Sequence, residues 1–572
     1  MTIAVNPETQ PKVSRRRRKL SLQYSAYFIH SLMGLKLTLL LTVVLLSGAL
    51  ATVQQEIDWL LYDEMRAQVQ QERLGAGELL DKLQAAYPDN GMFFFRTAED
   101  YPHLNAYARY IDNQGGWRQA WIDPYSGEVT GDTVLLTVGQ FIGFLHATLF
   151  LPAIGNSVVN ALGLLVLISL ITGLIAVPKF WRYFLVWPRR GNLRVFLGDL
   201  HRLVGLWSLW IVLIIGVTGS WWFYQDPFVK YFGVPDVVAA HREAPVLEPS
   251  QLSELAVAGV PVALTAAQVV ERVTAAYPDL QINVINPPEH NAEPYEVIGK
   301  RDEWLLSEWK GDRVFVHPYT GEIIVTYATA EFSPVQRFDL AMQPLHYGTW
   351  AHKSADITVK VIYLIGGLAM SFLAISGLIV SYKRVRRAAK KAQRYSLLRR
   401  RLLALWKVVR PWGGPMGVFK YFNLLALIGI CYGTSVALTL SEQGTRGSGY
   451  LYAEQSVGPW QVSMNAVAGL LEKDLPPIRP GVSTVLNASL SSEALQQIQF
   501  IYANVGEPLA LEEVEEFIHG PIGAKHMELE VPEQIDEETL LWVTAVDWQG
   551  QVYRRAWPLL PNGELTYKAQ QN

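Results

Sequence analysis

Long apolar runs alternate with polar stretches along this chain of 572 residues. Five runs have about the 20 apolar residues that a membrane-spanning helix needs, at 32–53, 155–177, 202–224, 358–381 and 419–440. The polar stretches carry strand-like alternation and turn residues. The pattern therefore predicts a membrane α-helical bundle with substantial soluble domains.

The first four apolar runs belong to a tandem repeat, whose halves we call the first copy and the second copy. Three positions return 171 residues later, with His30, Gly34 and Gly48 matched by His201, Gly205 and Gly219. Leu145-His146 likewise returns as Leu345-His346 before the next apolar run. Because a repeat fixes the architecture, we expect a helix, a soluble domain and a second helix in each copy. We therefore predict four core helices from the repeat and a fifth helix outside it.

The soluble segments 54–135 and 225–340 share one pattern of elements. Each begins with a helical pattern that ends in Tyr-Pro-Asp and closes on a Pro-Tyr-Ser/Thr-Gly-Glu turn. Proline pre-sets the backbone of such a turn, and glycine supplies its positive φ. We predict a small α+β module in each copy. The last segment, 441–572, has 18 Asp or Glu against 7 Lys or Arg and is expected to be a third α+β domain, whose acidic face is either solvated or a docking surface.

Positive charge predicts the topology. Basic residues fill 15–19, recur in the loop 178–199, and number twelve in 383–410, which has no Asp or Glu. The positive-inside rule places all three on the cytoplasmic side. The predicted order along the chain is a basic terminus with the first helix (1–53), a soluble domain (54–135), two helices with a basic loop (136–224), a soluble domain (225–340), a helix (341–382), a basic loop (383–418), a fifth helix (419–440) and an acidic domain (441–572).

The sequence bears on two further questions, whether the first apolar run is a signal peptide and whether disulfides can form. An Arg-rich start followed by Ala49-Leu50-Ala51 also fits a signal peptide, but the apolar run is long for one and its repeat partner is internal. The single cysteine, Cys431, excludes an intramolecular disulfide. We therefore expect the amino terminus to remain as a membrane helix.

Four histidines lie at helix ends in matched places of the two copies: His30, His201, His146 and His346. An ionisable residue at membrane depth is a functional hypothesis by default. Parallel repeats are related by an axis along the membrane normal, so matched residues face each other, the first two near the cytoplasmic face and the last two near the outer face. Facing imidazoles across an apolar slot suit a six-coordinate haem that transfers electrons.

The flanking residues sharpen this hypothesis and leave alternatives open. Gly34 and Gly205, one turn after a histidine, leave room for a porphyrin edge, although glycines also serve as plain helix-packing faces. No Cys-x-x-Cys-His occurs, so the sequence favours two non-covalent haems b. Zinc needs three or four ligands, copper has few methionines here, and His352 is an alternative outer ligand to His346.

These motifs resemble the PepSY-associated transmembrane family, which includes iron-regulated inner-membrane proteins and ferric-siderophore reductases. The resemblance rests on Asp199-Leu200-His201-Arg202 and Pro344-Leu345-His346-Tyr347-Gly348, with PepSY-like modules between the helices. It implies a haem-bearing protein of the bacterial inner membrane with periplasmic domains, in which Arg202 contacts a haem propionate. Ser31 stands where the pattern has a second such arginine.

The leading functional hypothesis is therefore an oxidoreductase that carries electrons across the membrane to a periplasmic ferric siderophore. The chain has no Gly-x-Gly-x-x-Gly fingerprint, so a quinol or a separate reductase must supply the electrons. The basic loop is expected to bind anionic lipid, and no nucleic-acid partner is expected. The alternatives are a non-enzymatic PepSY-based sensor or assembly factor, and a transporter.

Overall fold

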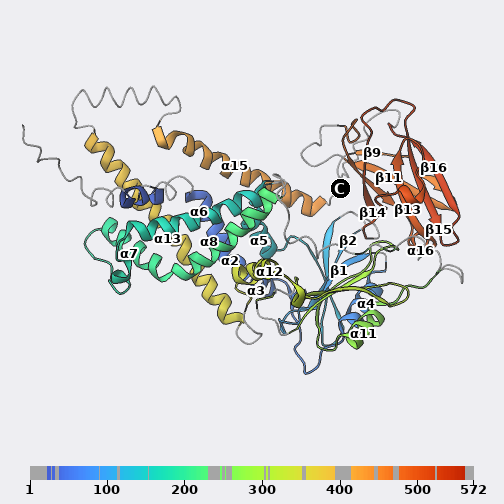
Figure 1. Ribbon diagram of the computed structural model, residues 1–572, viewed down its shortest axis with the longest axis horizontal. Helices are drawn as coiled ribbons and strands as arrows, with labels where there is room; N and C mark the ends of the chain where they lie inside the picture. The colour runs from blue at the N-terminus through green and yellow to red at the C-terminus, as the bar shows by residue number, and fades with distance from the viewer. Residues whose placement is uncertain are drawn as a thin grey trace, which may run out of the picture. The chain divides into compact units, whose positions relative to one another are not determined.

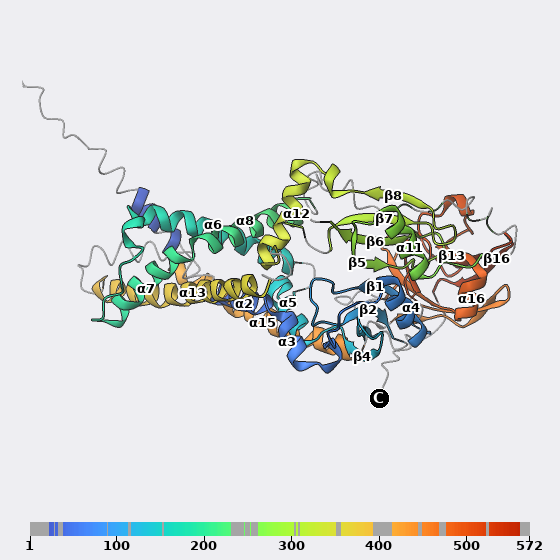
Figure 2. The same ribbon diagram turned by 90° about the horizontal axis from the view of Figure 1, so that it is seen from below.

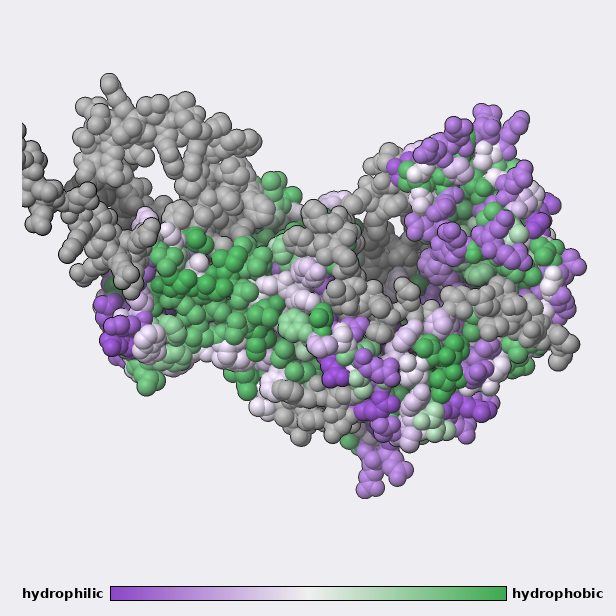
Figure 3. Space-filling model, viewed as in Figure 1, coloured by the Kyte–Doolittle hydropathy of each residue, from purple (hydrophilic) through white to green (hydrophobic). Residues whose placement is uncertain are grey.

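The computed structural model describes most of the chain in two compact units. The described residues are 22–27, 29–31, 38–88, 90–112, 116–151, 154–229, 245, 247, 252, 255, 261–301, 305–306, 309–350, 356–392, 414–443, 449–467, 476–521 and 525–560. The first unit comprises Met1–Gln54, Gly139–Asp236 and Met342–Val436, and the second comprises Gln55–Val138, Val237–Ala341 and Ala437–Asn572. Apolar side chains gather over the helices of the first unit, and polar ones over the second (Figure 3).

The first unit is built from apolar helices (Figure 1). Two of them are long and apolar enough to cross a membrane, α6 (Gly155–Ala176) and the Ile357–Val380 part of α13 (Asp356–Ala392). Up to four spans result if each bent helix pair counts as one. These pairs are α2 (Thr38–Ala51) with α3 (Gln54–Leu61), and α7 (Leu193–Trp207) with α8 (Leu209–Phe223). The predicted fifth span lies on α15 (Gly414–Gln443), whose described apolar stretch is the shorter Leu424–Leu438.

The predicted span over 202–224 is interrupted, because the chain bends by 69° between α7 and α8, which pass as one span only when taken together. Ser208, at the bend, has φ −89° and ψ 4°, outside the helical region. The two sides of the bend also differ in composition. Charged residues such as Asp199 and Arg202 lie on α7, whereas α8 is apolar on all sides. Because the bend separates Gly205 from Gly219, these two glycines do not share one continuous helix face with His201.

Helices of one copy pack mainly against helices of the other. In the first unit α6 packs on α8 and α13 packs on α2, each across the two copies, while α13 also packs on α7 of its own copy. Gly163 of α6 and Gly219 of α8 meet so closely that a Cβ added to either would lie within 3 Å of the other's backbone. Gly219 is therefore a packing glycine, in agreement with the close approach that small residues allow between membrane helices.

The soluble domains of the two copies form one continuous antiparallel sheet in the second unit. Its order is β4-β3-β2-β1-β5-β6-β7-β8. The first copy supplies β1 (Met92–Arg96), β2 (Ala106–Ile111), β3 (Trp117–Ile122) and β4 (Val129–Val134), and the second supplies β5 (Gln281–Asn286), β6 (Tyr295–Lys300), β7 (Asp312–Val316) and β8 (Ile323–Tyr327). The halves meet where Phe95 pairs with Ile285 and Arg96 pairs with Val284. Pairing β1 with β5 removes one edge from each half-sheet.

Two helices, α4 (Ala76–Ala86) and α11 (Ala266–Ala276), share one apolar core with this sheet (Figure 2). The helices touch where Gly77 lies against the backbone of Ala266. Across the same contact, the carboxylate of Asp81 accepts hydrogen bonds from the Ala266 and Ala267 amides at 2.8 and 3.0 Å. Asp81 thus caps the α11 amino terminus, whose first amides have no helical partner. The two halves therefore satisfy each other's polar groups as well as their apolar faces.

The last domain is mostly β, with two sheets around one core. The larger sheet contains β9 (Gly449–Leu451), β10 (Gln455–Val457), β11 (Trp460–Val467), β12 (Thr484–Ser489) and β14 (Lys525–Leu529), and the smaller contains β13 (Ile498–Val505), β15 (Leu540–Asp547) and β16 (Val552–Pro558). A single-turn helix, α16 (Ser492–Gln497), leads into β13. Buried side chains of both sheets, such as Trp460 and Trp557, form the core.

The last domain contacts loops of the second copy's half of the sheet. The Asn291 side chain, between β5 and β6, donates to the Ile498 carbonyl at 2.7 Å and accepts from the Tyr319 hydroxyl at 2.9 Å. The Lys525 ammonium donates to the Glu289 carbonyl. A small apolar cluster that includes Phe500 also joins these surfaces. The second copy therefore carries the attachment of the last domain.

Candidate cofactor site

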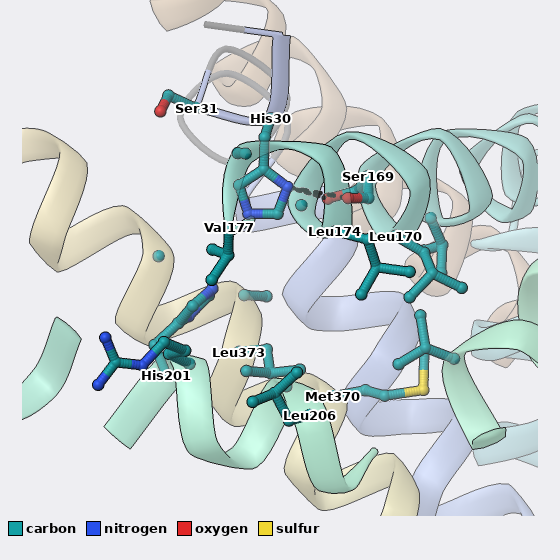
Figure 4. A pocket seen from close by; sticks show the side chains of 18 of the residues that line it. His30, Ser31, Ser169, Leu170, Leu174, Val177, His201, Leu206, Met370 and Leu373 are labelled. Atoms are coloured by element: carbon teal, nitrogen blue, oxygen red, sulfur yellow. Dashed lines mark hydrogen bonds between the residues drawn. The ribbon is translucent and has the colours of Figure 1, made fainter. Parts of the chain in front are cut away.

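The structure brings His30 and His201 together in the first unit. Their ring centres lie 6.2 Å apart, with the ring planes at 78°. His30 contacts α6, where its Nδ1 lies 2.9 Å from the Ser169 carbonyl. His201, on α7, contacts α13, where its Nδ1 lies 2.9 Å from the Ser376 hydroxyl. The two rings point toward one another (Figure 4). We call them the inner pair.

The inner pair opens into an apolar cavity of about 410 Å³, which is within the usual range of roughly 300–1,000 Å³ for cofactor and ligand sites. Aliphatic side chains from several helices line it, among them Leu41, Leu45, Leu162, Leu170, Leu206 and Met370. Ser31, Arg202 and Gly205 also line it. The cavity therefore joins the predicted inner residues in one space, apart from Gly34, which lies outside the described residues.

His146 and His346 form a second pair, which we call the outer pair. His146 lies near the end of α5 (Val138–Thr148) and His346 near the end of α12 (Pro334–Tyr347). Their ring centres are 6.0 Å apart and their planes are at 35°. The Nδ1 of His146 lies 2.9 Å from the Val44 carbonyl, and that of His346 lies 2.7 Å from the Thr218 hydroxyl. The predicted alternative ligand, His352, lies outside the described residues.

All four rings are fixed through Nδ1. A carbonyl can only accept, so Nδ1 of His30 and His146 carries the proton and Nε2 keeps its lone pair. Histidine ligands usually donate their other ring N–H to a carbonyl, carboxylate or water in this way. With about 2.1 Å from nitrogen to metal and roughly 1.2 Å from nitrogen to ring centre, two imidazoles on opposite sides of one metal lie about 6.5 Å apart. The observed spacings of 6.2 and 6.0 Å fit that arrangement.

Glycines make room for three of the rings. A Cβ on Gly48 would lie 2.7 Å from the His146 ring, one on Gly173 would lie 3.2 Å from His30, and one on Gly377 would lie 3.4 Å from His201. Gly205, which the sequence suggested leaves room for a porphyrin edge, would meet only a Leu373 methyl group at 3.7 Å and lines the cavity. Its role toward a porphyrin stays a prediction.

Sequence reasoning missed Gly173 and Gly377, although a signal was present. They are 204 residues apart, and each is followed by the same two residues, Leu174-Ile175 and Leu378-Ile379. Both glycines lie on the second helix of their copy, α6 and α13, and each contacts the histidine of the first helix. A search for matched glycines on both helices would have found them.

Arg202 is held at the cavity by neighbouring polar groups. Its guanidinium lies 3.3 Å from the Asp199 carboxylate and 4.3 Å from the centre of the Tyr183 ring. Asp199 is buried and also accepts from Arg189 Nε at 2.8 Å. The structure thus gives Arg202 a fixed position at the cavity wall, and its contact with a propionate stays a prediction.

Each histidine pair supplies two ligand nitrogens by itself. Within the part of the chain that the structure describes, no three His, Cys, Asp or Glu side chains gather as a group that could hold a metal ion. A site with two axial imidazoles needs no third protein ligand if a porphyrin supplies the other four nitrogens. The inner pair, with its cavity, therefore fits a haem, and the outer pair supplies the same two nitrogens.

Comparison with known proteins agrees with the resemblance noted in the sequence. A family model described as the PepSY-associated TM region matches residues 27–384. A second model, described as an uncharacterised conserved protein, matches residues 419–560. The chain is also 26% identical over 275 residues to the uncharacterized protein PA4219 of Pseudomonas aeruginosa. This match covers 45% of this chain and 66% of the relative. The match thus spans just under two thirds of the relative's length.

Proposed function

Because this chain belongs to the PepSY-associated TM family of membrane proteins, we propose that it binds two haems b and carries electrons across the bilayer. The observation that supports this most is the pair of facing imidazoles, found twice, with ring centres 6.2 and 6.0 Å apart. Each ring is fixed through Nδ1 and so presents Nε2. A haem with two axial histidines supplies one-electron transfer without an open coordination position.

The residues around the inner pair have separate tasks in this proposal. His30 and His201 hold the iron from opposite sides, and Ser169 and Ser376 fix their ring orientations. The aliphatic cavity wall excludes water, which lowers the local dielectric and strengthens the electrostatic interactions inside. Arg202 provides the cation for a propionate.

His146 and His346 hold the second haem, near the other side of the membrane. The His346 ring is packed against Trp222, with ring centres 4.8 Å apart, and Gly48 makes room for the His146 ring. Two sites of the same kind, one near each face, provide a route for an electron through an otherwise insulating layer. The basic segments orient the inner pair toward the cytoplasm, and in this proposal electrons enter there and leave from the outer pair.

We propose a periplasmic ferric-siderophore complex as the final acceptor. Reduction lowers the charge of the iron, so the hard oxygen ligands of a siderophore hold it less tightly. The family resemblance supports this substrate class. A quinol or a separate reductase is the donor in this proposal.

An absorption spectrum of the purified protein tests the haem proposal. Protein expressed with ample haem should be red, with b-type bands and two haems per chain by pyridine haemochrome assay. His201→Ala and His346→Ala should each lose about one haem, while His103→Ala, in the soluble part, should keep both. A protein that stays colourless after haem supplementation would reject the proposal and favour a sensor or assembly role. Retention of both haems by both variants would reject the ligand assignment.

The acceptor needs its own experiment. Protein reduced with a slight excess of dithionite under argon should be reoxidised when a ferric siderophore is mixed with it in a stopped-flow spectrometer. Ferrous iron should appear at the same rate, trapped by a ferrous chelator. The matched gallium complex, which has similar size and charge but is not reduced under these conditions, should leave the haems reduced. Equal reoxidation by both complexes would contradict the proposed substrate.

A further inference from the structure

The four histidines are fixed by carbonyl and hydroxyl groups in different combinations. In the first copy, Nδ1 of His146 contacts the Val44 carbonyl, and Nδ1 of His30 contacts both the carbonyl and the hydroxyl of Ser169, at 2.9 and 3.1 Å. In the second copy, His201 and His346 contact side-chain hydroxyls through Nδ1. Since a carbonyl belongs to the backbone and a hydroxyl to a side chain, the hydroxyl contacts are the ones that a point mutation can remove.

Thr218 is placed to accept a proton from His346. Its hydroxyl lies 2.7 Å from Nδ1 of His346 and 2.8 Å from the Ile214 carbonyl of its own helix. The single hydroxyl proton is directed to Ile214, because that carbonyl can only accept. The oxygen of Thr218 therefore accepts the Nδ1 proton. The Thr218 side chain is buried, at 1% exposure, so water does not replace it.

Ser376 has the matching place at the inner pair. Its hydroxyl lies 2.9 Å from Nδ1 of His201 and 3.3 Å from the Leu373 carbonyl. Ser376 is also 1% exposed. The same division follows, with the proton of Ser376 toward the helix backbone and its oxygen toward the histidine.

We infer that Thr218 and Ser376 are positioning residues that set the reduction potentials of the outer and inner haem sites, an inference that rests on the proposed function. An acceptor at Nδ1 draws the N–H bond toward itself and leaves more electron density on Nε2. A more basic Nε2 stabilises the ferric charge more than the ferrous charge. Loss of either hydroxyl should therefore make the corresponding site easier to reduce.

The chain offers a control residue for each of these hydroxyls. Ser47 lies 171 residues before Thr218, and its hydroxyl lies 2.7 Å from the Val43 carbonyl and 3.1 Å from the Val44 carbonyl that fixes His146. Thr172 lies 204 residues before Ser376, and its hydroxyl lies 2.7 Å from the Ile168 carbonyl and 3.2 Å from the Ser169 carbonyl that fixes His30. Both controls thus remove a buried helix hydroxyl that shares the anchoring carbonyl but leave the Nδ1 contact itself in position, so they should act only indirectly.

A potentiometric titration of the haem-loaded protein, followed at the reduced bands, tests the inference. Thr218→Val should move one of the two reduction steps to more positive potential, and Ser376→Ala should move the other. Ser47→Ala and Thr172→Val should move the same steps less, and Thr218→Ser should restore the wild-type value. If Thr218→Val loses the outer haem while Thr218→Ser keeps it, the positioning role is supported directly.

The outcome that overturns the inference differs from failure of the proposed function. Full haem content with unchanged potentials in both hydroxyl variants would remove the tuning role but leave the haem sites in place. Equal shifts in the test and control variants would also overturn it, since any helix hydroxyl would then have the same effect. A wild-type protein without haem would instead reject the proposed function itself.

Discussion

The two copies of the repeat keep the same histidine positions but support them differently. The first copy anchors its rings on the carbonyls of Ser169 and Val44, and the Ser169 hydroxyl also lies 3.1 Å from Nδ1 of His30. The second uses the hydroxyls of Ser376 and Thr218. In both copies the contact is made to Nδ1, and each pair draws one ring from each copy. The ring orientation is therefore kept, while the group that fixes it differs most clearly at the outer pair, a carbonyl for His146 and a hydroxyl for His346.

The soluble halves show the same kind of difference. In the first copy, the carboxylate of Asp123 accepts from the Tyr125 and Ser126 amides at 2.8 and 3.1 Å. In the second, Nδ1 of His317 accepts from the matching amides of Tyr319 and Thr320 at 3.2 and 3.3 Å. The two turns thus have the same geometry but a different acceptor. In the second copy the turn also supports the last domain, since the Tyr319 hydroxyl donates to Asn291, whose loop contacts that domain.

The largest effect is expected where a glycine lies against a ring. Gly48→Ala would place a Cβ 2.7 Å from the His146 ring and displace a proposed ligand, so the outer site should hold haem at least ~10-fold less tightly. Gly205→Ala meets only a methyl group at 3.7 Å and should keep both haems. The haem content of the two variants checks this. Equal retention would contradict the contact.

A pH change should weaken the attachment that distinguishes the second copy. Burial lowers the pKa of His290 to about 4, and the nearby Lys525 and His519 add to the shift. Below pH 6.5 the unfolded chain binds a proton at this histidine, whereas the folded protein does not. The free energy of unfolding therefore falls as the pH drops from 6.5 toward 4. The loss between pH 7 and 5 should be about 2 kcal/mol.

The variant His290→Gln isolates this contribution. It should have a weaker loss of thermal stability between pH 7 and 5 than the wild type, measured by the unfolding transition of the soluble domains. Burial raises the pKa of Glu293, which acts in the opposite direction but is common to both proteins. If the wild type and the variant lost the same stability, His290 would not be the sensitive group.

The smallest expected effect is the difference in stability loss between variants of the two matching turns, at Asp123 and at His317. Asp123→Ala removes an ionised acceptor from three amides, including that of Gln68 at 2.6 Å, and should destabilise by roughly 2–3 kcal/mol. His317→Ala removes two longer bonds from a neutral ring, whose pKa burial lowers, and should cost about 1 kcal/mol. Urea unfolding of the two variants compares them. A larger loss for His317→Ala would mean that docking of the last domain depends on this ring.

Much of the site could be predicted because the repeat placed histidines in matched positions. The pairing of His30 with His201 and of His146 with His346 needs only two-fold related helices, and hydropathy located those helices. The bend at Ser208 was not visible, since hydropathy averages over the charged α7 and the apolar α8. The partners of Gly48 and Gly173 were not visible either, because they come from other helices and depend on crossing geometry.

In the soluble domains, too, some features could be predicted from the sequence and others could not. The helix, strands and turn of each module follow from local periodicity and turn residues. The union of both modules into one sheet through Phe95 and Ile285 depends on which edge strands meet, and alternation within a strand does not encode that choice. The attachment of the last domain to Asn291 is likewise a matter of surface fit.

Electron paramagnetic resonance of the oxidised, purified protein tests the central claim most directly. Two imidazoles on each iron should give two low-spin ferric signals. The inner planes are at 78° and the outer planes at 35°, so the inner signal should be strongly anisotropic and the outer one rhombic, because near-perpendicular rings bring the iron dπ orbitals close in energy. His201→Ala should remove the first signal and His346→Ala the second. High-spin signals alone, or no ferric haem signal, would contradict the account.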